Sequence, residues 1–272
     1  AVAHDIDALW EGDAAHHYLL APPAGAASAR WSAARVRDFQ SSQGSRVRAL
    51  PPREDGVVSV PMDDADPELV EKLLAALHRD GVVVLTRAVD MAQVNRLKAE
   101  LRPHVDARPT AKSVQLGAHT KRLGAIVARA GEAAYPFVAH PALVALCEAV
   151  LGRQLLSARP PPERMDWTMH ISQLINVQPG CDAMGLHRDS NYIQLDVHDH
   201  TGLEVELGCV WALQEFSAEV GATRAVLGSH NWPRFWMNAE RNYPDVVDVP
   251  AVMGAGSCII SLGQTWHAAG AN

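Results

Sequence analysis

The chain has 272 residues, of which 48% are hydrophobic, and its net charge is −7. A chain of this size can bury a sizeable core, either as one β-rich domain or as two smaller domains. The negative charge without a long basic run argues against nucleic acid as a partner. No apolar run approaches the roughly 20 residues that span a membrane, so no membrane-spanning helix is expected.

The first 60 residues are predicted to form an irregular extension, because stretches rich in Ala, Pro, Gly and Ser interrupt them. The adjacent His16 and His17 are expected to be solvent-exposed, since neighbouring side chains diverge in helices and strands alike. No internal repeat or second domain is visible after this extension. Residues 61–272 are therefore predicted to form a single domain.

Regular structure is predicted to begin at Asp66, an N-cap residue followed by proline at the first helical position. An apolar helical stripe follows and ends at Asp80 and Gly81, a typical stop signal. The pattern then predicts a buried strand, a helix that Pro103 ends, and a third helix. Their ranges are 82–85, 91–101 and 141–151.

From residue 169 onward the pattern changes to short apolar stretches separated by turns. Many short strands at such spacing are typical of a sandwich or barrel. The predicted strands cover residues 169–177, 186–195, 203–213, 223–227, 246–253 and 257–262.

Four cysteines, Cys147, Cys181, Cys209 and Cys258, are scattered without a Cys-x-x-Cys spacing. This distribution favours buried thiols in a reducing compartment over a disulfide framework, and only Cys181, in a turn, is expected to be exposed. The sequence begins without Met, which suggests trimming, and shows no secretory signal. We therefore expect a soluble cytoplasmic protein.

A candidate metal site lies at His187 and Asp189, which are two apart and would project to the same side of a strand. His267, after the predicted strand at 257–262, would supply a third ligand. Two imidazoles and one carboxylate form the facial triad of non-haem Fe(II) oxygenases. A rival cluster of Asp196, His198 and His200 also alternates, but its polar surroundings favour a solvated hairpin end.

Several segments in order resemble the phytanoyl-CoA dioxygenase superfamily of Fe(II)/2-oxoglutarate oxygenases, nearer its secondary-metabolite members. The likeness runs from about Asp66 to the last residue. It rests on the stretches 80–85, 173–176, 187–189, 221–230 and 267–272.

The resemblance implies a double-stranded β-helix, or jelly roll, backed by helices, with Fe(II) bound by His187, Asp189 and His267. It also implies a 2-oxoglutarate pocket. The candidates for lining that pocket are Gln173, Trp211 and Thr223, with Lys121 or Arg122 as weaker candidates.

Two departures from the family pattern concern the cosubstrate. Relatives usually place an arginine about ten residues after the distal histidine, where it pairs with the C5 carboxylate of 2-oxoglutarate. The sequence ends at Asn272, before that position, so we expect the arginine and the last strands to lie beyond it. Met184 stands where many relatives carry glutamine, three residues before the first metal histidine.

The expected reaction is oxidation by O2, most simply hydroxylation, of a small and largely apolar natural product, with release of succinate and CO2. Polar substrate contacts are assigned to Arg188, Asn191, Tyr192 and Arg234. Two other hypotheses remain open: a metal-dependent jelly-roll isomerase or dioxygenase that does not use 2-oxoglutarate, and a non-catalytic partner subunit of the same fold. The sequence leaves the oligomeric state open.

Overall fold

The computed structural model describes residues 56–111, 119–152, 167–189, 204–231 and 246–272. Most of the predicted extension, with His16 and His17, lies outside these ranges. So do the rival cluster at 196–200 and most of the strand predicted at 186–195.

Two long helices follow the apolar patterns of the sequence. Helix α2 spans Leu69–Asp80, so the prediction of Asp66 as its N-cap is wrong: Glu68 is the N-cap residue, and no side chain caps the helix. Asp66 instead forms a turn before the helix by accepting a hydrogen bond from the backbone N–H of Glu68 (3.0 Å). Gly81 ends α2 in the left-handed conformation, with φ of 77°, as predicted. Helix α6 spans Pro141–Val150 and also matches its predicted range.

The expectation that Pro103 ends a helix is wrong, because α3 spans Met91–Asp106 and contains it. Proline removes one helical hydrogen bond and crowds the preceding turn. Here Leu101 and Val105, on either side of the proline, are both buried in one hydrophobic cluster. Their burial favours continuing the helix beyond the proline.

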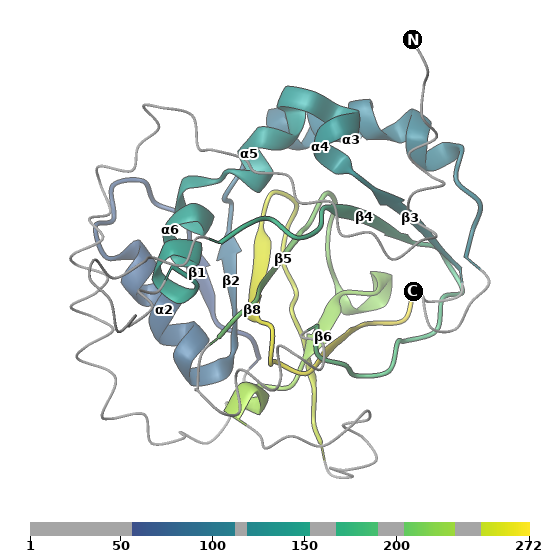
Figure 1. Ribbon diagram of the computed structural model, residues 1–272. Coiled ribbons are helices and arrows are strands. Elements are labelled where there is room, and N and C mark those ends of the chain that lie inside the picture. Colours follow the sequence, from purple (N-terminus) through teal and green to yellow (C-terminus); the bar gives the residue numbers. More distant parts are fainter. Residues whose placement is uncertain (1–55, 112–118, 153–166, 190–203, 232–245) are drawn as a thin grey trace, which may run out of the picture.

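Short helical segments follow that the apolar pattern did not predict. They are α4 (Ile126–Ala130), a 3₁₀ turn (Gly131–Ala134) and α5 (Tyr135–Val138), with further 3₁₀ turns at Ala218–Val220 and Ser229–Asn231. Together with α3, the first group lies beside strands β3 (Thr120–Gly124) and β4 (Gln173–Val177), which pair antiparallel (Figure 1).

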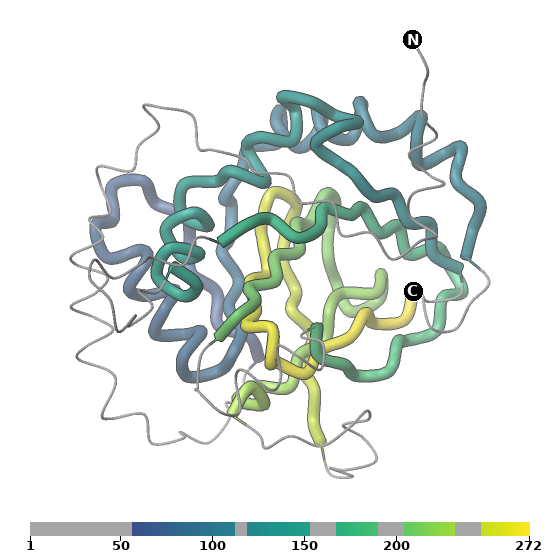
Figure 2. The backbone as a smooth tube through the Cα atoms, viewed as in Figure 1, coloured from purple at the N-terminus to yellow at the C-terminus, as the bar shows by residue number. Residues whose placement is uncertain are grey.

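The remaining strands form two sheets. The four-stranded sheet has the order β1 (Ser59–Pro61), β2 (Val82–Thr86), β8 (Cys258–Leu262) and β5 (Leu207–Trp211). Strand β1 runs parallel to β2, and the other neighbours are antiparallel. The three-stranded sheet has the order β7 (Val249–Pro250), β6 (Thr223–Ala225) and β9 (His267–Ala269). Figure 2 shows how the early β2 and the late β8 come to lie side by side.

Both faces of the four-stranded sheet are covered, which explains why the first four residues of β2, Val82 to Leu85, are all hydrophobic. Val83 packs with helices α2 and α6 in one core, and its neighbour Val84 packs with Ala225 of the smaller sheet in another. Alternation along the strand produces this division. The helices therefore lie on one side of the large sheet and the small sheet on the other, the layering of a jelly roll.

Cys181 is buried, with 4% of its surface exposed, so the expectation of an exposed thiol is wrong. Residues at the end of the sequence lie against the turn that contains Cys181. The backbone N–H of Asn272 donates to the Cys181 carbonyl (2.9 Å), and the Asn272 carbonyl accepts a hydrogen bond from the backbone N–H of Gly180 (2.7 Å). All four cysteines are free thiols. Burial raises the pKa of Cys147 to about 12, which makes that thiol unreactive at neutral pH.

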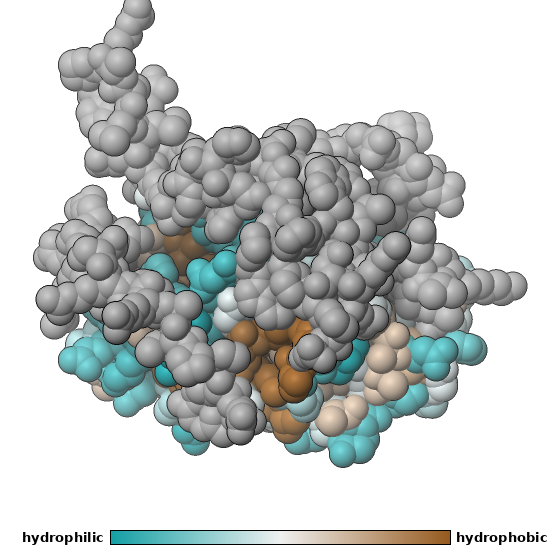
Figure 3. Space-filling view, turned by 90° about the horizontal axis from the view of Figure 1, so that it is seen from below, coloured by the Kyte–Doolittle hydropathy of each residue, from teal (hydrophilic) through white to brown (hydrophobic). Residues whose placement is uncertain are grey.

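The described surface is mixed in polarity. Figure 3 shows a hydrophobic area near the lower centre of the face that points down in Figure 1. Among the described residues, no single helix is long and apolar enough to cross a membrane, although the bent pair Ile126–Val138 and Pro141–Val150 passes the same test of length and composition.

Candidate metal centre

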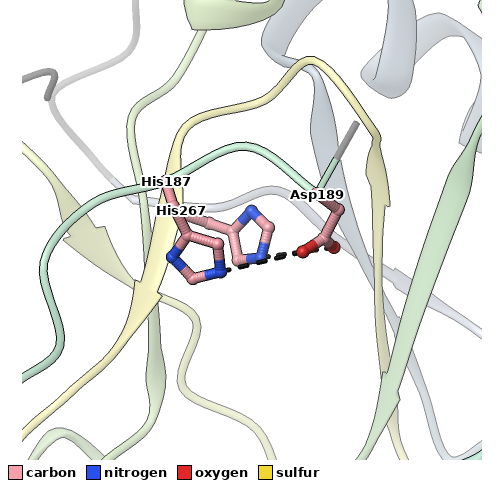
Figure 4. Close-up of side chains that lie close together, drawn as sticks. All are labelled: His187, Asp189 and His267. Carbon is pink, nitrogen blue, oxygen red and sulfur yellow. Dashed lines mark ion pairs between the residues drawn. The ribbon is translucent and has the colours of Figure 1, made fainter. Parts of the chain in front are cut away.

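The candidate metal centre is built on two histidines that lie opposite each other on two paired, antiparallel segments of the chain. His187 and His267 each donate a backbone N–H to the other's carbonyl oxygen, both at 2.9 Å. Residues opposed in this way in an antiparallel ladder carry their side chains on the same face. The two imidazole centroids accordingly lie 4.7 Å apart (Figure 4).

Asp189 completes the group, because it lies two residues after His187 and its carboxylate turns toward both rings. Its oxygens lie 3.7 Å from Nε2 of His187 and 3.5 Å from Nε2 of His267. The donor atoms of this His-Asp-His trio all lie within 4.8 Å of one another. Three ligand atoms that each lie about 2.1 Å from one ion, at right angles to one another, are about 3 Å apart. The three side chains would therefore need to move only slightly toward one another to bind a metal ion.

Both imidazoles are held in the tautomer that suits metal binding. Nδ1 of His187 lies 3.2 Å from the Gly185 carbonyl, and Nδ1 of His267 lies 3.0 Å from the Thr265 carbonyl. A carbonyl oxygen only accepts, so each Nδ1 carries a proton, and in the neutral imidazole this leaves the lone pair on Nε2. In both cases the carbonyl belongs to the residue two positions earlier.

The electrostatics of the trio favour neutral imidazole at His187. Burial, and then the neighbouring His267, lower the pKa of His187 below its ordinary value of 6.5. Neutral imidazole is the form that binds a metal ion. The contact of His187 with Asp189 is thus better read as two ligands sharing a site than as an ion pair.

Gly208 on β5 provides space beside the carboxylate. A Cβ built at this position would lie 3.5 Å from Oδ2 of Asp189 and 3.1 Å from Oγ of Ser261 on β8. A larger side chain there would project over the carboxylate. Nothing in the sequence pattern of β5 had indicated this role.

The structure brings Arg122 and Gln173 together near the trio. They lie on the paired strands β3 and β4, and Nη1 of Arg122 donates to Oε1 of Gln173 (2.9 Å). Nη2 of Arg122 lies 3.9 Å from the sulfur of Met184, and the arginine's charge contributes to lowering the pKa of His187. Burial lowers the pKa of Arg122 itself. A half-buried cation thus lies beside the candidate metal site.

Thr223 faces the same side as the trio. It opposes Ala269 in the β6–β9 pair, while Ala225, two residues on, opposes His267. Residues at alternate positions share a face, so the side chains of Thr223 and His267 project to the same side.

Two predicted site residues take other places. Trp211 is partly buried against the core, with its ring 5.2 Å from that of Phe137 and 5.6 Å from that of His140. It lies three positions after Gly208 on β5, so it projects to the face of the strand opposite the one that borders Asp189. Arg188 points away from the side on which His187 and Asp189 project. Its guanidinium lies 5.1 Å from the centre of the Trp266 ring and donates to the Ser229 carbonyl (3.1 Å). The other predicted substrate contacts, Asn191, Tyr192 and Arg234, lie outside the described residues.

Comparison with solved structures identifies the fold. The chain is similar to a non-haem α-ketoglutarate-dependent carbocyclase, SnoK, from nogalamycin biosynthesis, with a TM-score of 0.54 and 17% identity over 74% of this chain and 78% of the other. It is also similar to the epimerase SnoN of the same biosynthesis, with a TM-score of 0.51 and 19% identity over 76% of this chain and 78% of the other. The predicted jelly roll is therefore confirmed.

Comparison of sequences identifies the family. The family model named phytanoyl-CoA dioxygenase (PhyH) matches residues 77–272. The multifunctional dioxygenase prhA of Penicillium brasilianum is 30% identical over 74% of this chain and 67% of its own length. The dioxygenase aneA of Aspergillus aculeatus is 28% identical over 74% of this chain and 66% of its own length. The chain thus spans about two thirds of the length of these relatives.

Proposed function

Because this chain belongs to the phytanoyl-CoA dioxygenase family, and is thus a non-haem Fe(II)/2-oxoglutarate-dependent dioxygenase, we propose that it oxidises a small, largely apolar metabolite. Hydroxylation of a C–H bond is the simplest outcome. One observation carries the proposal: two imidazoles and a carboxylate converge with their donor atoms within 4.8 Å of one another.

We assign Fe(II) to His187, Asp189 and His267. The donor set supports this choice, since two nitrogens and one carboxylate oxygen on one side leave other positions of the ion open. The backbone carbonyls of Gly185 and Thr265 orient the two rings, which strengthens them as ligands. Bound iron supplies the activation of O2, coupled to conversion of 2-oxoglutarate to succinate and CO2.

Arg122 and Gln173 are assigned to the cosubstrate. An arginine is suited to a carboxylate because its planar fork can make two parallel hydrogen bonds. In the structure one arm of Arg122 bonds Gln173, so the pair can present a cation and an amide to the same anion. Thr223 projects to the same face as His267, and we assign its hydroxyl to the cosubstrate as well.

The apolar nature of the substrate is supported by side chains that share strand faces with these residues. Ile175 lies two positions after Gln173 on β4, and 46% of its surface is exposed. Val210 lies two positions after Gly208 on β5, with 43% exposed. Exposed hydrophobic side chains beside a polar group are typical of ligand sites. The fungal relatives are named dioxygenases, and the solved neighbours act in the biosynthesis of nogalamycin.

The first test is anaerobic titration of the Fe(II)-loaded protein with 2-oxoglutarate, in wild type and in His187→Ala. A visible charge-transfer band in the wild type that is lost in the variant would support both the iron ligand and the cosubstrate. Iron binding without such a band would contradict the use of 2-oxoglutarate at this site.

The second test identifies the outcome of the reaction. Aerobic incubation with a panel of apolar natural products should release succinate in step with consumption of one panel member. A product heavier by one oxygen atom would support hydroxylation. Loss of two hydrogens would indicate ring formation or desaturation, and an isomer of unchanged mass would indicate epimerisation.

A further inference from the structure

The segment that carries His187 contains one residue too many for regular pairing with β9. His187 and His267 exchange their backbone hydrogen bonds, so regular antiparallel pairing would next place residue 185 opposite Ala269. Instead, the N–H of Met184 donates to the Ala269 carbonyl (3.0 Å). Three steps on one segment therefore match two on the other, which is the geometry of a β-bulge.

The bulge contributes directly to the metal site. Gly185 lies within the bulge, and its carbonyl accepts from Nδ1 of His187 at 3.2 Å. In regular pairing the N–H of residue 185, not that of Met184, would donate to the Ala269 carbonyl. Such a one-residue change of register would send the side chains of this segment to the opposite face. The orientation of His187 thus depends on keeping the extra residue in place.

Arg224 of β6 holds the bulge from the face opposite the trio. Its Nη2 donates to the Met184 carbonyl (2.9 Å), and its Nη1 pairs with Oδ2 of Asp248 at 2.6 Å. Arg224 lies next to Ala225, which opposes His267, so its side chain points to the other face of the strand. The side chain is three-quarters buried. One guanidinium therefore joins β6, the start of the bulge and the approach to β7.

We propose that Arg224 is a positioning residue for the metal site, acting on His187 through the bulge at 184–187. The proposal rests on the assignment of Fe(II) to the trio and extends it to a residue that touches neither metal nor substrate. Charge-assisted hydrogen bonds to a half-buried carbonyl are among the stronger ones, so loss of Arg224 leaves the Met184 carbonyl without this donor. The bulge can then shift toward regular pairing, and His187 loses its bond to Gly185.

The experiment compares Arg224→Gln with Arg79→Gln in the complete chain. Arg79 provides a matched control, because it also pairs a partly buried guanidinium with an aspartate, Asp80, at the C-terminal end of helix α2. Co(II) affinity and the visible Co(II) spectrum are measured for each protein, together with thermal unfolding without metal. The spectrum reports ligand geometry in the folded, loaded protein, which a loss of general stability alone does not change.

We expect Arg224→Gln to weaken Co(II) binding about 10- to 100-fold and to change the spectrum, because partners of a ligand tune its affinity to this extent. Arg79→Gln should match the wild type in both. Arg224→Lys, which keeps the charge but cannot present two fixed donors, should fall between them. If Arg224→Gln does not fold, Arg224→Lys carries the test with the same direction of change.

The outcomes separate the two proposals. If the wild type binds no metal, the assignment of the trio fails and the role of Arg224 fails with it. If the wild type binds Co(II) and the folded Arg224 variants match it in affinity and spectrum, only the role of Arg224 is overturned. An equal change in Arg79→Gln would also overturn it, since the effect would then be general.

Discussion

His187 and His267 lie 80 positions apart in the sequence, yet each accepts the other's backbone N–H at 2.9 Å. This reciprocal bond makes the distance between the two imidazoles a property of the strand pairing, because opposed residues in a ladder share a face. Asp189 then needs only the alternation of the same segment to reach both rings. The two imidazoles therefore come together through this one pairing, with the bulge at 184–187 beside it.

Replacing any member of the trio should strongly weaken iron binding. His187→Ala, Asp189→Ala or His267→Ala removes one of three ligands, and we expect Fe(II) affinity to fall more than about 100-fold, since partners outside the ligand set already account for 10- to 100-fold. Isothermal titration under anaerobic conditions measures the change. The control is His104→Ala, at the end of α3, which should bind as the wild type does. Full iron binding in a trio variant would exclude that residue as a ligand.

Arg122→Met should weaken 2-oxoglutarate without removing the metal. Losing a charged hydrogen-bond donor at a half-buried site should raise the KM for 2-oxoglutarate about 10- to 100-fold, with a smaller effect on kcat. Lys121→Met, one position earlier on β3, is the matched control because its ammonium approaches the Asp106 carbonyl (3.4 Å) instead of Gln173. Equal KM values in the two variants would argue against a role for Arg122 in cosubstrate binding.

Gly81→Ala should destabilise the fold by more than its backbone conformation alone explains. A Cβ there would lie 2.5 Å from both Nδ1 of His230 and Oγ1 of Thr265. Gly180→Ala provides the control, because Gly180 has a similar φ of 82° but open space around the added carbon. We expect about 1–2 kcal/mol lost for Gly180→Ala from the left-handed conformation, and about 1–3 kcal/mol more for Gly81→Ala from overlap.

Urea denaturation of the two glycine variants measures the difference in the free energy of unfolding. A loss in Gly81→Ala no larger than that in Gly180→Ala would mean that His230 and Thr265 move aside without cost.

His140 should make stability fall as the pH drops below neutral. It is 5% exposed, and burial lowers its pKa below the ordinary 6.5, although the Ala88 carbonyl 3.0 Å away opposes the shift. Between the lowered pKa and 6.5 the unfolded chain binds more protons than the folded one, so the free energy of unfolding decreases as the pH falls through this range.

The comparison for His140 is His140→Gln, which keeps a donor for the Ala88 carbonyl but does not titrate. The stability advantage of the wild type over this variant should be constant above pH 6.5 and shrink below it. Urea denaturation at several pH values measures the advantage, and a constant difference down to pH 5 would contradict the prediction.

The sequence predicted the local parts of this fold better than the distant pairings. The stop at Gly81 and the shared face of His187 and Asp189 follow from helix and strand periods, which act over a few residues. Pro103 was misjudged because burial of Leu101 and Val105 favours the longer helix, and such burial is a tertiary effect. His267 was predicted as the third ligand from its place after the apolar strand at 257–262 together with the family resemblance, but no local pattern predicts its direct pairing with His187.

The surroundings of the site were harder to predict than its centre. Arg122 stands in the polar strand Thr120–Gly124, which lacks the apolar alternation that indicates a strand, so its pairing with β4 was not predicted. Gly208 and Arg224 act through space and through a bulge, and neither leaves a spacing in the sequence that could reveal it. The family resemblance predicts Trp211 in the pocket, whereas its ring lies against Phe137.

The position of β2 in the large sheet has a consequence for synthesis of the protein. On one edge β2 pairs with β1, but its other edge pairs only with β8, which begins about 170 residues later. At 5–20 residues per second, the ribosome needs roughly 10–30 s to make the missing partner. During that time a strand of four consecutive apolar residues, Val82 to Leu85, has an open edge on the nascent chain. The yield of folded enzyme should therefore depend on how well chaperones shield this edge until translation reaches β8.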